Sequence, residues 1–168
     1  MKKYTIYKGY HYSNFLPSFR KVSNDFSISA NVLFDESCKY KIEEKSCVNK
    51  LFGFCFGFGV HKNSVRFGWT YNNEKNSIII WKYIYSNKKL FKEKIYSCEI
   101  GEFHKYQLYL IRQDSYYKVG FYIDNRFVCS DKLKSDSCFI TTLGPYFGGN
   151  TRAPHKMIIN FETPLKIS

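Results

Sequence analysis

The sequence contains few of the residues that favour helices. Alanine and glutamine each occur only twice among the 168 residues. Isoleucine, valine, threonine, phenylalanine, tyrosine and tryptophan, which favour strands, together occupy 61 positions. This balance excludes a helical bundle and a fold of alternating strands and helices. The length suits one domain with a sizeable core, so we predict a single all-β domain over residues 1–168.

Long apolar segments are also absent. The longest purely apolar run is Ile78–Trp81, which is far too short to span a membrane. The amino-terminal segment MKKYTIYKGYHY opens with lysines but lacks the apolar stretch of a signal peptide. We therefore expect a protein made in the cytoplasm, without a membrane partner.

Metal-binding spacing is missing from the six cysteines and four histidines. No two cysteines have CxxC spacing, and the histidines are not spaced with them as zinc ligands. In a cytoplasmic protein such cysteines are reduced and mostly buried. We predict free thiols, no metal and no cofactor. The cysteines are Cys38, Cys47, Cys55, Cys98, Cys129 and Cys138.

Acidic residues are scarce relative to basic ones. The chain has 26 Lys and Arg against 14 Asp and Glu, a formal net charge of +12. This excess points to an acidic partner such as a nucleic acid, an anionic glycan or an acidic protein surface. However, only five of the cations are arginine, and Lys, Asn, Ile, Tyr and Phe fill 79 positions, as AT-rich coding produces. Phosphate recognition favours arginine, so we do not predict nucleic-acid binding.

Apolar and polar residues alternate with a period of two along most of the chain, as in strands with one face in a core. The pattern predicts about ten to twelve strands in a two-sheet antiparallel β-sandwich or jelly roll. The clearest segments are 26–34, 51–59, 65–71, 77–85, 89–97, 105–112, 116–123 and 156–162.

Several of these segments support more specific predictions. In 51–59 four phenylalanines alternate with small residues, so the phenylalanines are expected in the core. The glycine face is expected near a ligand ring, a loop or a partner, or packed under large aromatic rings of the neighbouring strand. Segment 77–85 is apolar on both faces and is expected inside a sheet, whereas lysine-rich 89–97 is expected at an edge. Asp124-Asn125 predicts a two-residue hairpin turn. The polar stretch 35–50 is predicted to be a mobile or partner-contacting loop.

Two segments carry polar side chains suited to binding. In 61–69, Arg66 lies between Val65 and Phe67 and therefore points away from the core if they point inward. His61 precedes it in a polar turn. In 143–157, Gly148-Gly149 and Pro154 shape a loop. That loop presents Asn150, Arg152 and His155. The alternative for both segments is purely structural, an exposed turn and a loop that caps the sandwich.

If both segments lie at one end of the curved sheet, these side chains converge. They offer many hydrogen-bond donors and few acceptors, which suits a carboxylated or sulfated sugar or an acidic patch on a protein. Trp69 shares the core side with Val65 and Phe67, so the residues expected to stack on a ligand are Tyr83, Tyr85 and Tyr146.

The same two segments carry a family resemblance. The motifs NKLFGF and HKNSVRFGW within 49–69, and LGPYFGGNTRAPHKMIINF at 143–161, resemble a group of small proteins of gut bacteria and their phages. That group is similar to the concanavalin A-like lectin/glucanase superfamily, which implies a jelly roll with a glycan site on the curved sheet or its loops. The chain departs from the group's pattern at two positions. It has Val60 where the group has a second histidine, and Lys156 where the group has an aspartate. The missing acid argues against a cation site in the last loop.

Catalytic patterns are weak. No predicted strand carries two inward acids, as glycoside hydrolysis on such a sandwich requires. No serine or cysteine shows a nucleophile motif. Tyrosine, histidine and arginine are the residue types of polysaccharide lyases, but tyrosine is abundant throughout this chain. No catalytic residue is therefore assigned, and the sequence leaves enzymatic activity open while favouring none.

The function predicted from the sequence is a non-enzymatic β-sandwich module. The resemblance points to a bacteriophage virion accessory protein, a head decoration or fibre component assembled in the host cytoplasm, with carbohydrate binding. Its partners would be virion proteins or an acidic glycan, and a homodimer or homotrimer is left open. The alternative is a free carbohydrate-binding or polysaccharide-lyase-like protein acting on an acidic glycan. A third alternative is a sandwich that binds nucleic acid through its basic face.

Overall fold

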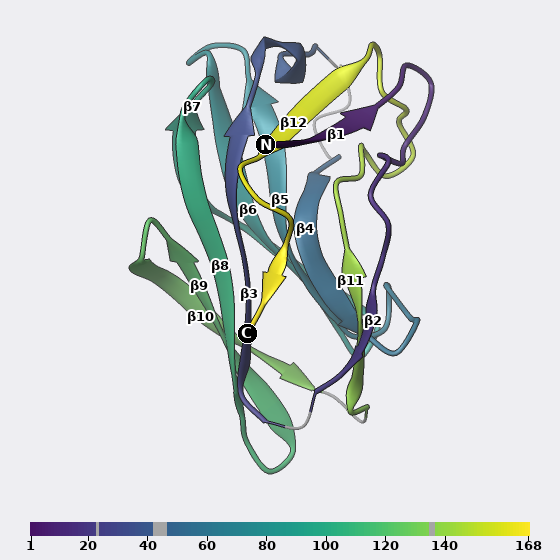
Figure 1. The fold of residues 1–168 in the computed structure, drawn as a ribbon, viewed down its shortest axis with the longest axis vertical. Coiled ribbons are helices and arrows are strands. Elements are labelled where there is room, and N and C mark those ends of the chain that lie inside the picture. The colour runs from purple at the N-terminus through teal and green to yellow at the C-terminus, as the bar shows by residue number, and fades with distance from the viewer. Residues whose placement is uncertain (23, 42–46, 135–136) are drawn as a thin grey trace.

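The protein folds into two antiparallel β-sheets packed face to face, shown for the computed structural model in Figure 1. The structure describes residues 1–22, 24–41, 47–134 and 137–168. The first sheet has the order β1 (Lys2–Ile6), β12 (Met157–Phe161), β3 (Phe26–Phe34), β8 (Phe103–Arg112), β9 (Tyr116–Ile123), β10 (Arg126–Lys134), with β13 (Lys166–Ile167) also paired to β3. The second has the order β2 (Phe19–Lys21), β11 (Phe139–Leu143), β4 (Asn49–Phe56), β5 (Ser64–Asn72), β6 (Ser77–Ser86), β7 (Lys89–Glu99). The predicted all-β sandwich is confirmed.

The core lies between the sheets and is rich in aromatic rings. The alternating residues of 65–69 behave as predicted, because Val65, Phe67 and Trp69 are all fully buried. Phe67 contacts Tyr106 and Phe121 of the opposite sheet edge to face, with ring centroids 5.3 and 5.2 Å apart. Such T-shaped pairs add to the stabilisation from buried area. The core is therefore an interlocked set of rings from both sheets.

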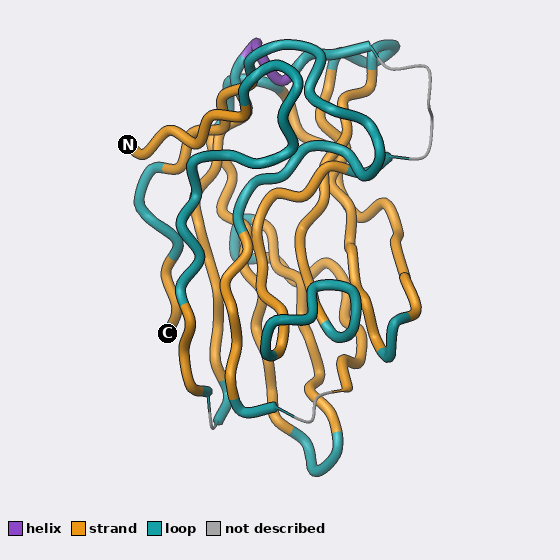
Figure 2. Tube along the Cα trace, turned by 90° about the vertical axis from the view of Figure 1, so that its right-hand side faces the viewer, coloured by secondary structure: helices purple, strands orange, loops and turns teal. Residues whose placement is uncertain are grey.

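The strand edges and the hairpin also match the sequence. Lysine-rich β7 is the edge of the second sheet, and β6 lies inside that sheet between β5 and β7. Asp124 and Asn125 have φ of 50° and 61°, the left-handed pair that a type I′ turn requires between β9 and β10. Figure 2 shows the strands running along the length of the sandwich, with loops crowded at one end.

Two predictions need correction. Phe58 is 80% exposed rather than in the core, because β4 ends at Phe56 and the chain turns at Gly57, where φ is +61°. The stretch 35–50 is also not one open loop. A short 3-10 helix (η1, Glu36–Cys38) begins it and buries Cys38, and Asn49 and Lys50 belong to β4. Residues 42–46 of that stretch lie outside the described residues.

All six cysteines are free thiols, and Cys38, Cys55 and Cys98 are buried. Within the described ranges, no helix has the length and apolarity needed to cross a membrane.

Candidate functional site

The outer face of the second sheet carries a hollow, and the alternation of side chains along the strands decides which residues face it. Because Val65 and Phe67 point inward, Arg66 between them faces outward, and its cross-strand neighbour Tyr83 does the same. Beside them lies a cavity of about 610 Å³. We call this cavity the basic groove; the residues that define it are Lys50, His61, Arg66, Tyr83, Tyr85, Tyr146 and Asn150.

Arg66 is the central charge of the basic groove. It is only 7% exposed, and its guanidinium carbon lies 5.2 Å from the centroid of the Tyr83 ring. Its Nε is buried and has no hydrogen-bond partner among the described residues. Burial lowers the Arg66 pKa, although an arginine stays charged at any ordinary pH. The groove therefore contains a buried positive charge with an unused donor.

A glycine makes room for this arginine. A Cβ at Gly53 would lie 2.0 Å from the Val65 carbonyl oxygen and 2.9 Å from the Cγ of Arg66. Any side chain at this position would thus displace β5 or the arginine. Gly53 is thus approached by the β5 backbone and the Arg66 side chain, which none of the alternatives given for the glycine face of 51–59 anticipated.

Lys50 is the second cation of the groove, and the sequence pattern missed it. Its Nζ donates a hydrogen bond to the carbonyl oxygen of Gly148 (2.8 Å) and lies 4.9 and 5.6 Å from the ring centroids of Tyr83 and Tyr146. Burial, together with the nearby positive charge of Arg66, lowers the Lys50 pKa to about 8. Lys50 is thus charged at neutral pH and close to neutralisation at mildly alkaline pH.

A β-bulge explains why Lys50 faces outward. Strict alternation would place it on the core side with Phe52 and Phe54. The β4–β5 register instead shifts between Lys50 and Phe52, so Lys50 pairs with outward-facing Gly68 and Leu51 becomes the extra residue. The sequence contained no signal for this shift.

Aromatic side chains form the walls. The rings of Tyr83 and Tyr85 lie 5.8 Å apart, and the His61 ring meets Tyr85 edge to face at 5.0 Å. Burial, followed by the hydrogen bond with Tyr85, raises the Tyr83 pKa, so this phenol keeps its proton. On the opposite wall Tyr146 stacks on His11 at 5.3 Å.

The Gly148-Gly149 loop is fastened to β4. The backbone N–H groups of Lys50 and Tyr146 each donate to the other's carbonyl oxygen, at 2.8 and 3.0 Å. The N–H of Gly148 donates to the Asn49 side chain at 2.6 Å. Gly148 has φ of +67°, and a Cβ there would lie 2.1 Å from the carbonyl oxygen of Thr151. Only glycine fits this turn, which places Tyr146 and Asn150 beside the groove.

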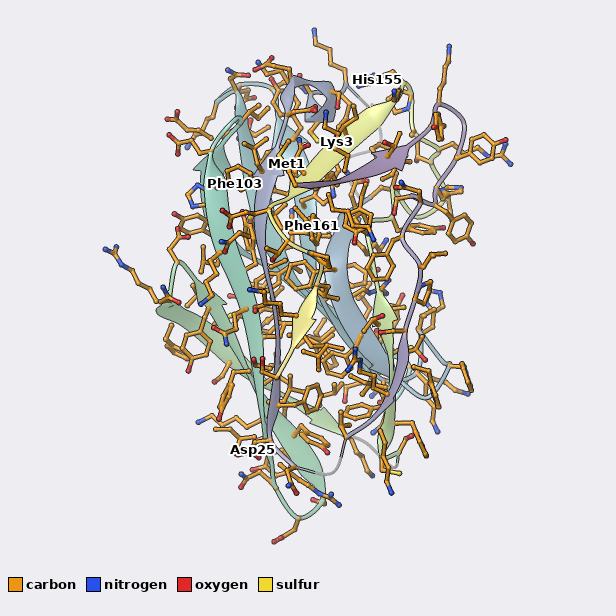
Figure 3. All side chains as sticks on the ribbon, viewed as in Figure 1. Met1, Lys3, Asp25, Phe103, His155 and Phe161 are labelled. Atoms are coloured by element: carbon orange, nitrogen blue, oxygen red, sulfur yellow. The ribbon has the colours of Figure 1, made fainter. Side chains whose placement is uncertain are left out.

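The structure therefore brings together six of the eight residues selected from the sequence. Arg152 and His155 do not line the groove. Arg152 is exposed, and the His155 ring nitrogen Nε2 lies 2.9 Å from the carbonyl oxygen of Ser37, beside η1 at the end of the sandwich (Figure 3). After Asn150 the chain leaves the second sheet, because the N–H of Ala153 donates to the Tyr10 carbonyl oxygen.

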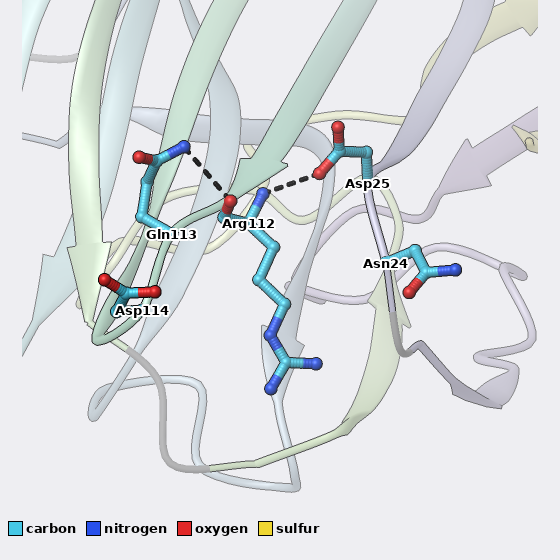
Figure 4. A pocket seen from close by; sticks show the side chains of 5 residues that line it. All are labelled: Asn24, Asp25, Arg112, Gln113 and Asp114. Atoms are coloured by element: carbon cyan, nitrogen blue, oxygen red, sulfur yellow. Dashed lines mark hydrogen bonds between the residues drawn. The ribbon is translucent and has the colours of Figure 1, made fainter.

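A second hollow lies far from these residues, at the β8–β9 turn. Figure 4 shows Asn24, Asp25, Arg112, Gln113 and Asp114 around an open polar depression. The Arg112 N–H donates to the Asp25 carboxylate (2.7 Å), and the Gln113 amide donates to the Arg112 carbonyl oxygen (3.0 Å). These contacts fasten the turn to the start of β3, so we assign the depression a structural role.

The lack of acidic residues in the lining of the basic groove distinguishes it from a cation site. Of the described residues that line it, none carries a carboxylate. Elsewhere in the described part of the chain, no three His, Cys, Asp or Glu side chains are grouped so as to hold a metal ion. The groove thus offers positive charge, phenol and imidazole rings and one amide, an arrangement that suits an anionic ligand with ring surfaces.

Comparison with known proteins places the fold among sandwich proteins. The sequence matches no known family and no curated protein. Among solved structures, alginate lyase AlyC3 superposes with a TM-score of 0.60 at 9% identity, covering 99% of this chain and 69% of the lyase. A functionally unknown protein from Saccharomyces cerevisiae gives 0.55 at 11% identity, with 99% and 87% covered. An endo-1,3-beta-glucanase from Streptomyces sioyaensis gives 0.53 at 11%, with 92% and 67% covered.

At these identities the comparisons show the fold alone. The chain shares a two-sheet β-sandwich fold with this alginate lyase and this glucanase. A second structure of AlyC3, in complex with dimannuronate, gives a TM-score of 0.59 at 9% identity. This chain spans only 65% of that lyase's length.

Proposed function

We propose that the protein binds an anionic polysaccharide, a chain containing uronic acid units, in the basic groove. The observation that carries this proposal is the Nε of Arg66, a buried charged donor without a partner among the described residues. A buried charge with an unsatisfied donor costs free energy, and a carboxylate in the groove would compensate the charge of the guanidinium. Burial and then the nearby charge of Arg66 lower the Lys50 pKa, and an anion would relieve the repulsion between the two cations.

The aromatic walls of the groove and one protein of similar fold support a sugar as the molecule that carries the carboxylate. Tyr83, Tyr85 and Tyr146 offer ring faces and hydroxyl groups, the usual combination for holding a polar molecule with an apolar face. One protein of similar fold was solved with dimannuronate, a disaccharide of two uronic acid units.

Calorimetric titration tests this proposal. Wild-type protein titrated with oligomannuronate should bind, and a neutral oligoglucan should not. Arg66→Ala should weaken binding at least about tenfold, since charge-assisted hydrogen bonds contribute about 1.5–3 kcal/mol. The matched control is Arg126→Ala, which removes an exposed arginine of β10 in the other sheet. If both variants bind like wild type, the groove is not the site.

Cleavage of the glycan is a second candidate, which corresponds to the lyase-like alternative from the sequence. It is favoured by His61 and the tyrosine pair, which stand beside the carboxylate-neutralising Arg66. In β-elimination a base removes the proton on the carbon next to the carboxylate. The bond from the adjacent ring carbon to the glycosidic oxygen breaks, that oxygen takes up a proton, and a carbon–carbon double bond forms. Tyr83, which keeps its proton, is suited to donate it.

The new double bond, conjugated with the carboxylate, absorbs ultraviolet light, so a uronate polymer incubated with the protein provides a direct assay. If cleavage occurs, Tyr83→Phe should abolish it, while the retained ring still allows the variant to bind the polymer. If wild type produces no absorbance change on a polymer that it binds, the protein is a binding module.

From the sequence resemblance we also propose display on a phage particle, where many copies turn weak sugar binding into firm attachment. The measurement is co-sedimentation with purified particles. A protein absent from particles would be the free glycan-binding protein instead. Nucleic-acid binding, the third alternative from the sequence, predicts affinity that falls steeply with salt.

A further inference from the structure

The outer face that carries the basic groove holds another depression farther along β5 and β6. Its cavity measures about 510 Å³, and its floor and rim include Thr70, Ile79, Trp81, Lys92 and Lys94. Of the described residues lining it, Glu74 alone carries a carboxylate. Its character is therefore the same as that of the groove: cations and an aromatic ring on the face of a sheet.

Trp81 is held as a fixed surface in this depression. Its indole N–H donates a hydrogen bond to the Thr70 hydroxyl at 2.9 Å, which fixes the ring on the sheet. The Lys94 Nζ lies 5.4 Å from the ring centroid. Trp81 is partly exposed, whereas Trp69, the other tryptophan of the chain, is fully buried in the core. A rigid indole with a cation above it can hold a sugar ring and its acid group together.

The two depressions are adjacent steps of one cross-strand ladder. Arg66 pairs with Tyr83, and Gly68 pairs with Trp81, so the two aromatic rings are two residues apart on β6 and on the same face. This spacing corresponds to about 7 Å along the strand. On β7, Lys92 pairs with Tyr83 and Lys94 with Trp81, and both lysines line the Trp81 depression. Each depression thus combines an aromatic ring of β6 with nearby cations.

Gly68 lies between the two steps on β5 and leaves room for the Val48 side chain. A Cβ at this position would lie 2.5 Å from the Val48 Cγ1 and 3.3 Å from the Trp81 Cβ. Val48 therefore covers Gly68 and lines the Trp81 depression, so a ligand chain that reaches both depressions crosses an apolar contact between their cations.

We propose that the Trp81 depression is a second subsite for the same anionic chain. This inference rests on the proposed function. It adds that the ligand is a polymer bound along its length, with successive acidic units at Arg66 and Lys50 and then at Lys94 above Trp81. Binding then strengthens with chain length, which a site for a single acidic sugar does not predict.

The experiment compares oligomannuronates from disaccharide to octasaccharide by calorimetric titration. Wild type should bind the longer chains at least about tenfold more tightly than the disaccharide. Lys94→Ala should weaken binding of the octasaccharide by about fivefold, the scale of one exposed cation contact, and leave binding of the disaccharide unchanged. The matched control is Lys132→Ala, because the Lys132 Nζ lies 4.9 Å over the Tyr116 ring on the other sheet.

Tryptophan fluorescence gives a second readout that does not depend on affinity. Acrylamide should quench partly exposed Trp81 and spare buried Trp69. Saturation with octasaccharide should protect the quenchable fraction, and Trp81→Phe should remove that fraction altogether.

The outcomes separate the two proposals. If binding depends on Arg66 but does not grow with chain length, and quenching is unchanged, the second subsite is wrong and the proposed function stands. If no anionic chain binds wild type, both proposals fail.

Discussion

Replacing Lys50 by methionine should stabilise the protein at neutral pH and weaken glycan binding. Lys50 is 7% exposed, and its pKa falls from 10.5 to about 8 on folding. Each pKa unit corresponds to about 1.36 kcal/mol, so keeping this amine charged in the fold at pH 7 costs about 3 kcal/mol. Methionine fills a similar volume without charge. The lost hydrogen bond to Gly148, about 1 kcal/mol, offsets part of the gain.

The pH dependence gives the sign of the effect. Between pH 8 and 10.5 the unfolded chain keeps the Lys50 proton that the folded protein has lost, so the stability contributed by this group rises with pH. From pH 7 to pH 10 the rise should be about 2 kcal/mol. Below pH 8 both states are protonated and the full cost remains.

Urea unfolding of wild type and Lys50→Met across this pH range measures the difference. Buried thiols such as Cys98, whose pKa rises to about 11, lower the free energy of unfolding as the pH rises. They do so equally in both proteins. The free energy of unfolding of wild type minus that of the variant should therefore climb with pH. A difference that stays flat from pH 7 to pH 10 would refute a lysine that titrates near pH 8.

Three further predictions concern the fold. Phe54→Ala should cost about 3–5 kcal/mol in urea unfolding, whereas Phe58→Ala, at an 80% exposed side chain, should cost under about 1 kcal/mol; equal costs would mean that the face assignment is wrong. Six thiols should react in denaturant, and in the native protein exposed Cys138 should react long before buried Cys38, an order that the reverse kinetics would contradict. Gly148→Ala should destabilise the protein by at least about 1 kcal/mol and weaken glycan binding, because both the φ and the space require glycine; an unchanged unfolding midpoint would disprove the tight turn.

The two-sheet architecture could be predicted because the sequence of a strand shows directly which residues share a face. Side chains alternate with a period of two, so Val65, Phe67 and Trp69 identified the core face, and Arg66 was assigned to the other face. The Asp124-Asn125 turn was readable for an equally local reason, since few residue pairs accept two left-handed conformations.

Assembly of the groove depended on contacts between distant segments. Its wall at Tyr146 meets Lys50 through backbone pairing across almost 100 residues, and local patterns carry no information about such pairing. The bulge that turns Lys50 outward is likewise fixed by the register of β4 against β5. Proximity in sequence to Asn150 did not bring Arg152 into the groove, because Ala153 pairs with Tyr10 and leads the chain away.

The sequence by itself thus determined the longer strands, the buried face of β5 and the outward direction of Arg66, since each follows from neighbours within a few residues. Only the tertiary structure decided which outward side chains share a cavity. That outcome depends on strand order, on one shifted register and on the path of a glycine turn at Gly148. Each of these is set by packing over the whole sandwich rather than by the local chain.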